Sequence, residues 1–98
     1  MKIIQKLADM INEEIADAHR YARCYEEYKD FEPELSRMFS TLANEELNHA
    51  TIIHAQVVRI IKKYRDENGE PPAHMQAIYD YLHQRSIDKS NEVRLMLS

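Results

Sequence analysis

Apolar residues recur at steps of three and four along most of this chain, which is the spacing of an amphipathic α-helix. Between residues 2 and 29 the apolar stripe reads Ile4, Leu7, Ile11, Glu14, Ala18, Tyr21, Tyr25 and Tyr28. A second stripe, between residues 33 and 66, reads Leu35, Phe39, Leu42, Glu46, His49 and Ile53. A third and more interrupted stripe reads Met75, Ile78, Leu82, Val93 and Leu97. The pattern predicts an all-α protein with helices over about residues 2–29, 33–66 and 72–96.

Two breaks separate the expected helices. Pro33 suits the first turn of a helix, and Glu34 beside it suits the positive end of the helix dipole. The second helix is expected to end before Asn68-Gly69, which can supply a left-handed cap, and Pro71-Pro72 prevents its continuation. Because the first connection is short, the first two helices are expected to form a long antiparallel hairpin. The third helix is expected to pack less completely, or to pack against a partner subunit.

Composition and charge narrow the class of protein. Ninety-eight residues form one small domain, residues 1–98, and a single Gly with three Pro leaves no room for a turn-rich β fold. Charged residues at 31% and hydrophobic residues at 44% suit amphipathic helices rather than disorder or a membrane span. The net charge of -4 argues against a nucleic-acid partner, and a single cysteine, Cys24, excludes an internal disulfide. Charged residues directly after Met1 predict a soluble cytoplasmic protein.

Three polar residues interrupt the apolar stripes of the hairpin: Glu14, Glu46 and His49. Glu46 and His49 form a Glu-x-x-His pair, and residues three apart on a helix project from one face. Glu14 lies about 17 residues before the middle of the turn, and the pair lies about 14 to 18 residues after it, so all three should reach one level of the hairpin. A carboxylate in an apolar row is costly unless it is paired or metal-bound. The sequence therefore predicts a metal site at these three residues.

A metal site is one of two interpretations of this cluster. The other is a buried salt-bridge and hydrogen-bond cluster that sets the register of a non-enzymatic helical oligomer. Glu13 takes the place of Glu14 if the register of the first helix shifts by one residue. Structural roles are expected for the other candidates, namely Tyr21, Tyr25 and Tyr28 as core aromatics, Cys24 as a small apolar residue, His54 near the stripe without a neighbouring carboxylate, and His19, His74 and His83 at the surface.

The number of metal-binding groups predicts a site shared between chains. One chain supplies two carboxylates and one imidazole, which are too few to hold two cations. Two chains related by a two-fold axis supply four carboxylates and two imidazoles, and the four negative charges balance two divalent cations. Such a homodimer brings two hairpins together as a four-helix bundle. Oxygen-rich ligation with one imidazole per metal suits iron or manganese, without excluding zinc.

Residues 10–55 resemble the ferritin-like, rubrerythrin-type di-iron family. The resemblance rests on Glu14 with Tyr21 seven residues later, on the small residues Ala18 and Ala22, and on residues 43–50, Ala-Asn-Glu-Glu-Leu-Asn-His-Ala. In that family a Glu and a Glu-x-x-His on two helices form half of the metal site, and a second helix pair supplies the other half. Here the third helix carries no Glu-x-x-His and no fourth helix follows. The chain is therefore similar to the half-bundle ferritins of encapsulin shells, in which two chains complete one site.

The resemblance implies a function as well as a fold. It implies a ferroxidase that oxidises Fe(II) with oxygen or peroxide, in iron storage or in protection from oxidative stress. It implies Glu46 as a bridging ligand, Glu14 as a second carboxylate ligand and His49 as a terminal ligand. Tyr21 would supply a hydrogen bond or an electron. A homodimer or a ring-like oligomer is implied, with an encapsulin shell as a partner. The lack of a four-cysteine centre argues against a complete rubrerythrin peroxidase.

Overall fold

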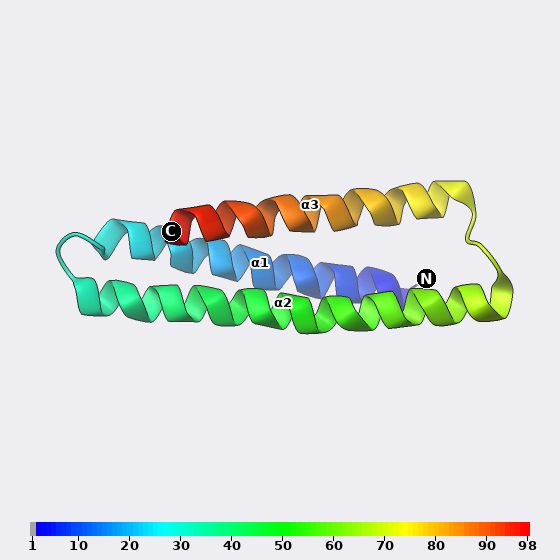
Figure 1. Ribbon diagram of the computed structural model, residues 1–98, viewed down its shortest axis with the longest axis horizontal. Helices are drawn as coiled ribbons and strands as arrows, with labels where there is room; N and C mark the ends of the chain where they lie inside the picture. Colours follow the sequence, from blue (N-terminus) through cyan, green and yellow to red (C-terminus); the bar gives the residue numbers. More distant parts are fainter. Residues whose placement is uncertain (1) are drawn as a thin grey trace.

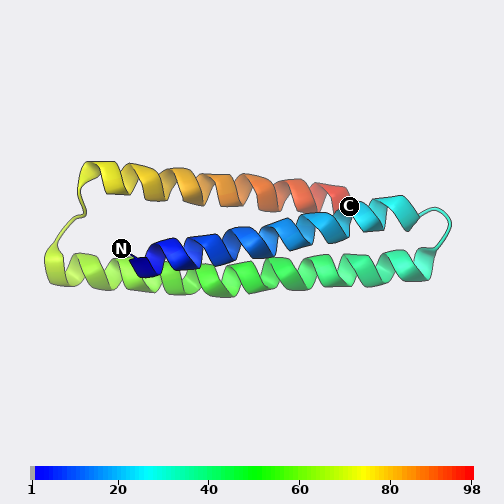
Figure 2. The same ribbon diagram turned by 180° about the vertical axis from the view of Figure 1, so that it is seen from behind.

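The computed structural model describes residues 2–98, which form three helices with overall extents of 56 × 18 × 18 Å. The helices are α1 (Lys2–Tyr28), α2 (Pro33–Asn68) and α3 (Ala73–Leu97), and the described residues contain no strand (Figure 1). The all-α prediction is confirmed, and each helix end lies within two residues of its expected position. α1 and α2 lie side by side and antiparallel, as Figures 1 and 2 show from opposite sides, so the predicted hairpin is confirmed as well.

α2 begins at the predicted residue, Pro33, and ends at Asn68, two residues later than predicted. Pro33 occupies the first turn, where its missing N–H costs nothing, and Glu34 supplies a negative charge near the positive end of the dipole. At the other end Gly69 has a φ of 80°, and its N–H donates to the carbonyl oxygen of Arg65 at 2.8 Å. Only glycine adopts this left-handed conformation without strain, so Gly69 closes the helix before the two prolines.

The core of the hairpin is offset from the predicted stripe of α2. The fully buried residues are Ile4, Ile11, Ile15, Ala18 and Ala22 on α1, and Ser36, Ala43, Leu47 and Ala50 on α2. Each buried residue of α2 directly follows a residue of the predicted stripe, so the stripe itself is only half-buried or exposed. The stripe indicates buried positions for Glu46 and His49, but in the single chain Glu46 is half-buried and His49 is exposed. The reason is that α3 covers one side of the hairpin, and within residues 2–98 no element covers the other.

α3 contacts the hairpin mainly through its C-terminal half. Val93 is fully buried against Ala18, Ala22 and Leu47, and Met96 and Leu97 pack around this cluster. Nearer its start α3 meets α2 through polar side chains, with Arg65 donating a hydrogen bond to Gln76 and His54 pairing with His83. Ile78, which the third stripe includes, has 53% of its surface exposed. The less complete packing expected for this helix is thus observed. Its charged interruptions leave too few consecutive apolar positions to cover α2 along the whole length.

None of the three helices within residues 2–98 contains a stretch that is apolar enough to cross a bilayer. This agrees with the charge that all three carry along their exposed faces.

Candidate metal centre

Glu14 of α1 and the Glu46–His49 pair of α2 lie together in the structure. One potential ligand atom from each of the three residues lies within 4.8 Å of the other two. The antiparallel hairpin brings them to the same level, because the rise per residue is the same in both helices. Glu46 and His49 share one side of α2, because three residues advance the helix by nearly one full turn. We refer to these three residues as the carboxylate–histidine cluster.

The imidazole of His49 lies between the two carboxylates. Its Nδ1 atom is 3.4 Å from Oε2 of Glu14 and 3.6 Å from Oε2 of Glu46. The two glutamate side chains are 27% and 20% exposed, whereas the His49 side chain is 52% exposed. Both distances are longer than a good N–H···O hydrogen bond. The three groups thus lie near one another without forming a tightly hydrogen-bonded ion pair.

The two carboxyl groups of the cluster affect one another. A hydrogen bond with Glu14 raises the pKa of Glu46 above its ordinary value, and partial burial and repulsion from Glu14 act in the same direction. His49 opposes the rise, mainly through its charge. A raised carboxyl pKa means that the charged form lacks sufficient positive partners. A divalent cation would provide them, and its binding would displace the proton.

The cluster faces away from α3. Residue His19 follows Glu14 by five positions and residue His54 follows His49 by five, which places each about 140° further round its helix. Both of these histidines contact α3, His19 through Glu92 at 3.4 Å and His54 through His83 at 2.9 Å. α3 therefore occupies the opposite side of the hairpin, and the cluster lies on the side that none of the described elements covers.

We refer to the side of the hairpin that carries the cluster and faces away from α3 as the open side. Aromatic residues lie on this open side between the cluster and the first turn. Tyr21 stacks on Phe39 with ring centroids 6.4 Å apart, and Tyr28 stacks on the same ring at 6.0 Å. The guanidinium of Arg20 lies 5.4 Å from the centre of the Tyr21 ring. Tyr21 lies seven residues, or about 10 Å of helix rise, from Glu14. In the single chain it is a packing residue beside the cluster, and none of its described contacts is with a ligand atom.

The remaining sequence candidates fall outside the cluster. Glu13 is exposed and contributes no atom to the cluster, so the register that uses Glu14 is the one that the structure has. Cys24 is a half-buried free thiol, and His74 is exposed. His83, expected at the surface, is indeed exposed but pairs with His54, a contact that the sequence analysis missed. No pattern within one helix could reveal it, because the contact depends on how α3 lies beside α2.

The carboxylate–histidine cluster has the groups that bind hard or borderline divalent cations. Carboxylates with an imidazole suit Fe(II), Mn(II) and Zn(II), and the cluster contains no thiolate. Comparisons of the chain with protein-family models, with curated proteins and with solved structures found no match. The residues of the cluster and their geometry are the basis of the functional proposal that follows.

Proposed function

We propose that this chain is a ferritin-like di-iron protein with ferroxidase activity, and that two copies complete its metal site. The observation that carries the proposal is the meeting of Glu14, Glu46 and His49 on the one side of the hairpin that α3 leaves open. Three such groups at one level of two antiparallel helices are half of the ligand set of a di-iron four-helix bundle.

A second copy of the chain is the proposed source of the other half. The open side carries half-buried apolar residues before and after the cluster: Leu7, Tyr21, Tyr25, Tyr28, Leu35, Phe39, Leu42 and Ile53. Packing two such sides about a two-fold axis would bury these residues and bring two clusters together. The dimer would then present four carboxylates and two imidazoles to two cations, in a layer shielded from water.

The proposed reaction takes Fe(II) as substrate. Two Fe(II) ions each lose one electron, and one molecule of oxygen takes both electrons with two protons to give hydrogen peroxide. With hydrogen peroxide as the oxidant, the same two electrons and two protons give two molecules of water. In the proposed assignment Glu46 bridges the two ions, Glu14 binds one ion, and His49 completes its ligand set. Tyr21 lies on the same side and would supply a hydrogen bond at the dimer interface.

Metal content and oxidation rate test the proposal together. Protein stripped with EDTA and loaded with Fe(II) without oxygen should bind one iron per chain and sediment as a dimer. Admission of air should then oxidise the iron faster than in a matched solution containing the His49→Ala protein. A chain that oligomerises but binds neither Fe(II) nor Mn(II) would favour the alternative, in which the cluster sets the register of a structural helical oligomer.

A further inference from the structure

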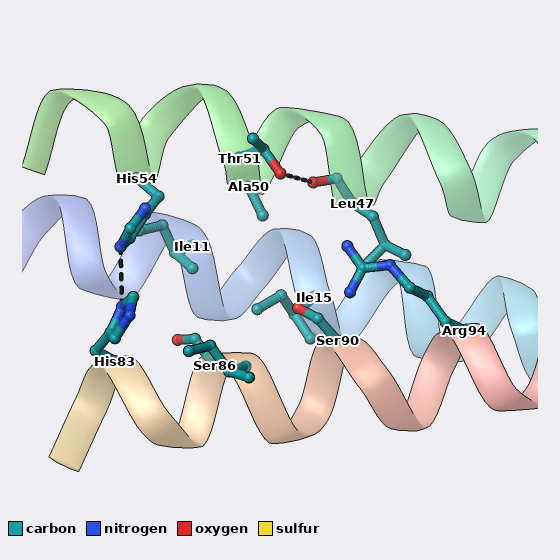
Figure 3. Close-up of a pocket in the computed structure, with 11 residues that line it drawn as sticks. Ile11, Ile15, Leu47, Ala50, Thr51, His54, His83, Ser86, Ser90 and Arg94 are labelled. Atoms are coloured by element: carbon teal, nitrogen blue, oxygen red, sulfur yellow. Dashed lines mark hydrogen bonds between the residues drawn. The ribbon is translucent and has the colours of Figure 1, made fainter. Parts of the chain in front are cut away.

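His54 of α2 and His83 of α3 meet across the gap between these helices. Nε2 of His54 is 2.9 Å from Nδ1 of His83, and the ring centres are 4.7 Å apart. Figure 3 shows the two imidazoles pointing toward one another from different helices, with Arg94 at the far end of the same pocket. The pair lies on the side of the hairpin opposite the carboxylate–histidine cluster.

Two neutral imidazoles at this separation are close to a chelating arrangement. Zinc–nitrogen bonds of about 2.0–2.1 Å in tetrahedral geometry place two ligand nitrogens about 3.3 Å apart. The observed 2.9 Å separation therefore has to widen by only about 0.4 Å. One of the two nitrogens carries the proton of their hydrogen bond. Transfer of that proton to the other nitrogen of the same ring leaves both facing lone pairs available without changing the net charge.

The surroundings leave space for a cation and for water ligands. Two cavities, of about 210 and 720 Å³, adjoin the pair, and His54, His83 and Ser86 line both. Asp80 lines the larger cavity three residues before His83, on the same side of α3. Three carboxylates, from Asp66, Glu70 and Asp80, line the larger cavity with Lys62 and Arg65, and Arg94 lines the smaller one. The anionic and cationic groups of the two cavities are therefore equal in number, and the preference for a cation comes from the imidazoles and from the space beside them.

The protonation state also favours ligation at neutral pH. Burial, together with the neighbouring His83, lowers the pKa of His54 below its ordinary value of 6.5. The ring is accordingly neutral at pH 7, and only the neutral ring binds metal. Imidazole nitrogen is preferred by Zn(II), Cu(II) and Ni(II) over the harder Mn(II), so this pair differs from the carboxylate-rich cluster in the cation that it selects.

We propose that His54 and His83 form a second metal site, for an imidazole-preferring divalent cation such as Zn(II), which ties α3 to α2. The two imidazoles would supply two ligands to the cation. Water molecules in the adjoining cavities, which Ser86 also lines, would supply the others. The site is independent of the ferroxidase proposal, because it uses different residues on a different side of the hairpin.

Zinc titration of the EDTA-stripped Glu46→Ala protein tests this second site, since that substitution disables the carboxylate–histidine cluster. Calorimetry should show one Zn(II) bound per chain. The added substitution His83→Gln should weaken binding at least 30-fold, whereas His74→Gln, at an exposed histidine of the same helix, should leave it unchanged. Hydrogen exchange of α3 amides should slow on addition of Zn(II) only where His83 is present.

Two results would overturn the site: no zinc binding by the Glu46→Ala protein, or unchanged binding after His83→Gln. Circular dichroism checks that each variant remains helical. If His83→Gln fails to fold, NMR of the Glu46→Ala protein replaces it as the test. The ring signals of His19, His49, His54 and His74 are assigned by substituting each of them with Gln in turn, and the remaining signal is that of His83. The signals of His54 and His83 should then shift with zinc. Shifts confined to other histidines would refute the proposal equally.

Discussion

Each glutamate of the carboxylate–histidine cluster directly follows another glutamate, whose side chain points away from the cluster. Glu13 precedes Glu14 and Glu45 precedes Glu46, and both preceding residues are exposed and outside the cluster. One residue step rotates a helix by about 100°, which is enough to remove a carboxylate from the site. The chain thus contains its own matched controls for the assignment of ligands.

The first prediction uses these controls. Glu46→Ala and His49→Ala should each weaken anaerobic Fe(II) or Mn(II) binding by at least ~100-fold, more than removal of a group that only supports a ligand. Glu45→Ala and Glu13→Ala should bind as the unaltered protein does, because neither side chain reaches the cluster. Isothermal titration calorimetry measures all four. Tight binding retained by His49→Ala would refute the ligand assignment.

The second prediction concerns the pH dependence of the metal-free protein. The pKa of Glu46 is raised above its ordinary value of 4.5, first by its hydrogen bond with Glu14. A group whose pKa is higher in the folded protein than in the unfolded chain stabilises the folded state. This stabilisation is complete at pH values below the pKa of the unfolded chain, and it is lost as pH rises through the pKa of the folded protein. In EDTA, the free energy of unfolding should therefore fall as pH rises above 4.5 toward neutrality.

Glu46→Gln should remove this contribution, because an amide does not titrate. Urea unfolding at several pH values, in EDTA, compares the two proteins, with Glu45→Gln as the control. Mn(II) at about 100 times its Kd should stabilise the unaltered protein by about 2.7 kcal/mol and leave Glu46→Gln nearly unaffected. An equal pH dependence for all three proteins would show that the carboxyl pair is not under electrostatic strain.

At the scale of a single element, α3 depends on one buried side chain. Val93 is the only fully buried residue of this helix among those described, and it packs against Ala18 and Ala22 of α1. Small alanines on α1 let the two backbones approach closely at this point. The other end of α3 is joined to α2 by polar contacts instead, between Arg65 and Gln76 and between His54 and His83.

The third prediction is that Val93→Ala loosens α3 while leaving the hairpin folded. Removal of two buried methyl groups should cost about 1–3 kcal/mol, from lost burial and the cavity left behind. Hydrogen exchange should rise along α3 far more than along α1 and α2. Ile78→Ala is the control, because Ile78 is exposed and its truncation should change little. Equal acceleration in all three helices would mean that the chain unfolds as one unit.

The fourth prediction concerns acid loosening of the same helix. Burial first, and then His83, lower the pKa of His54 from 6.5. A group whose pKa is lower in the folded protein than in the unfolded chain stabilises the folded state at pH values above the pKa of the unfolded chain. This stabilisation is lost as pH falls through the pKa of the folded protein. In EDTA, the contact between α2 and α3 should therefore weaken below about pH 6.5, when a second proton would place two cations side by side.

Hydrogen exchange, corrected for the intrinsic effect of pH, should show this loosening in the first half of α3. His54→Gln should reduce it, since glutamine carries no proton in this range. His74→Gln is the matched control on α3. Acid loosening of equal size in His54→Gln would assign the effect to other groups.

At the scale of the whole molecule, the open side of the hairpin predicts linkage between metal and assembly. If the proposed dimer binds cations and the single chain does not, cations must promote dimerisation. Sedimentation of dilute protein should show a larger dimer fraction with Mn(II) than with EDTA, by at least ~10-fold in the association constant. His49→Ala should abolish the difference. A single chain that binds one cation without gaining mass would contradict the shared site.

The helices and the members of the cluster were predictable because they depend on local sequence. Steps of three and four indicate which residues share a side of a helix, and Pro33 and Gly69 mark the ends of α2. Equal rise per residue in the antiparallel hairpin brings Glu14 level with Glu46 and His49. These inferences need only helix geometry and a short connection.

The tertiary structure decided which side of that hairpin is covered. α3 packs beside Ala18, Ala22 and Leu47, whereas Ala50 packs against Ile11 and Ile15 of α1. The buried residues of α2 accordingly lie one position beyond the predicted stripe. It also pairs His54 with His83 and leaves His49 exposed. None of this follows from periodicity, because both sides of the hairpin carry apolar residues. Which side of the hairpin α3 covers depends on the direction in which residues 69–72 lead the chain. It also depends on where Val93 can pack closely against the hairpin.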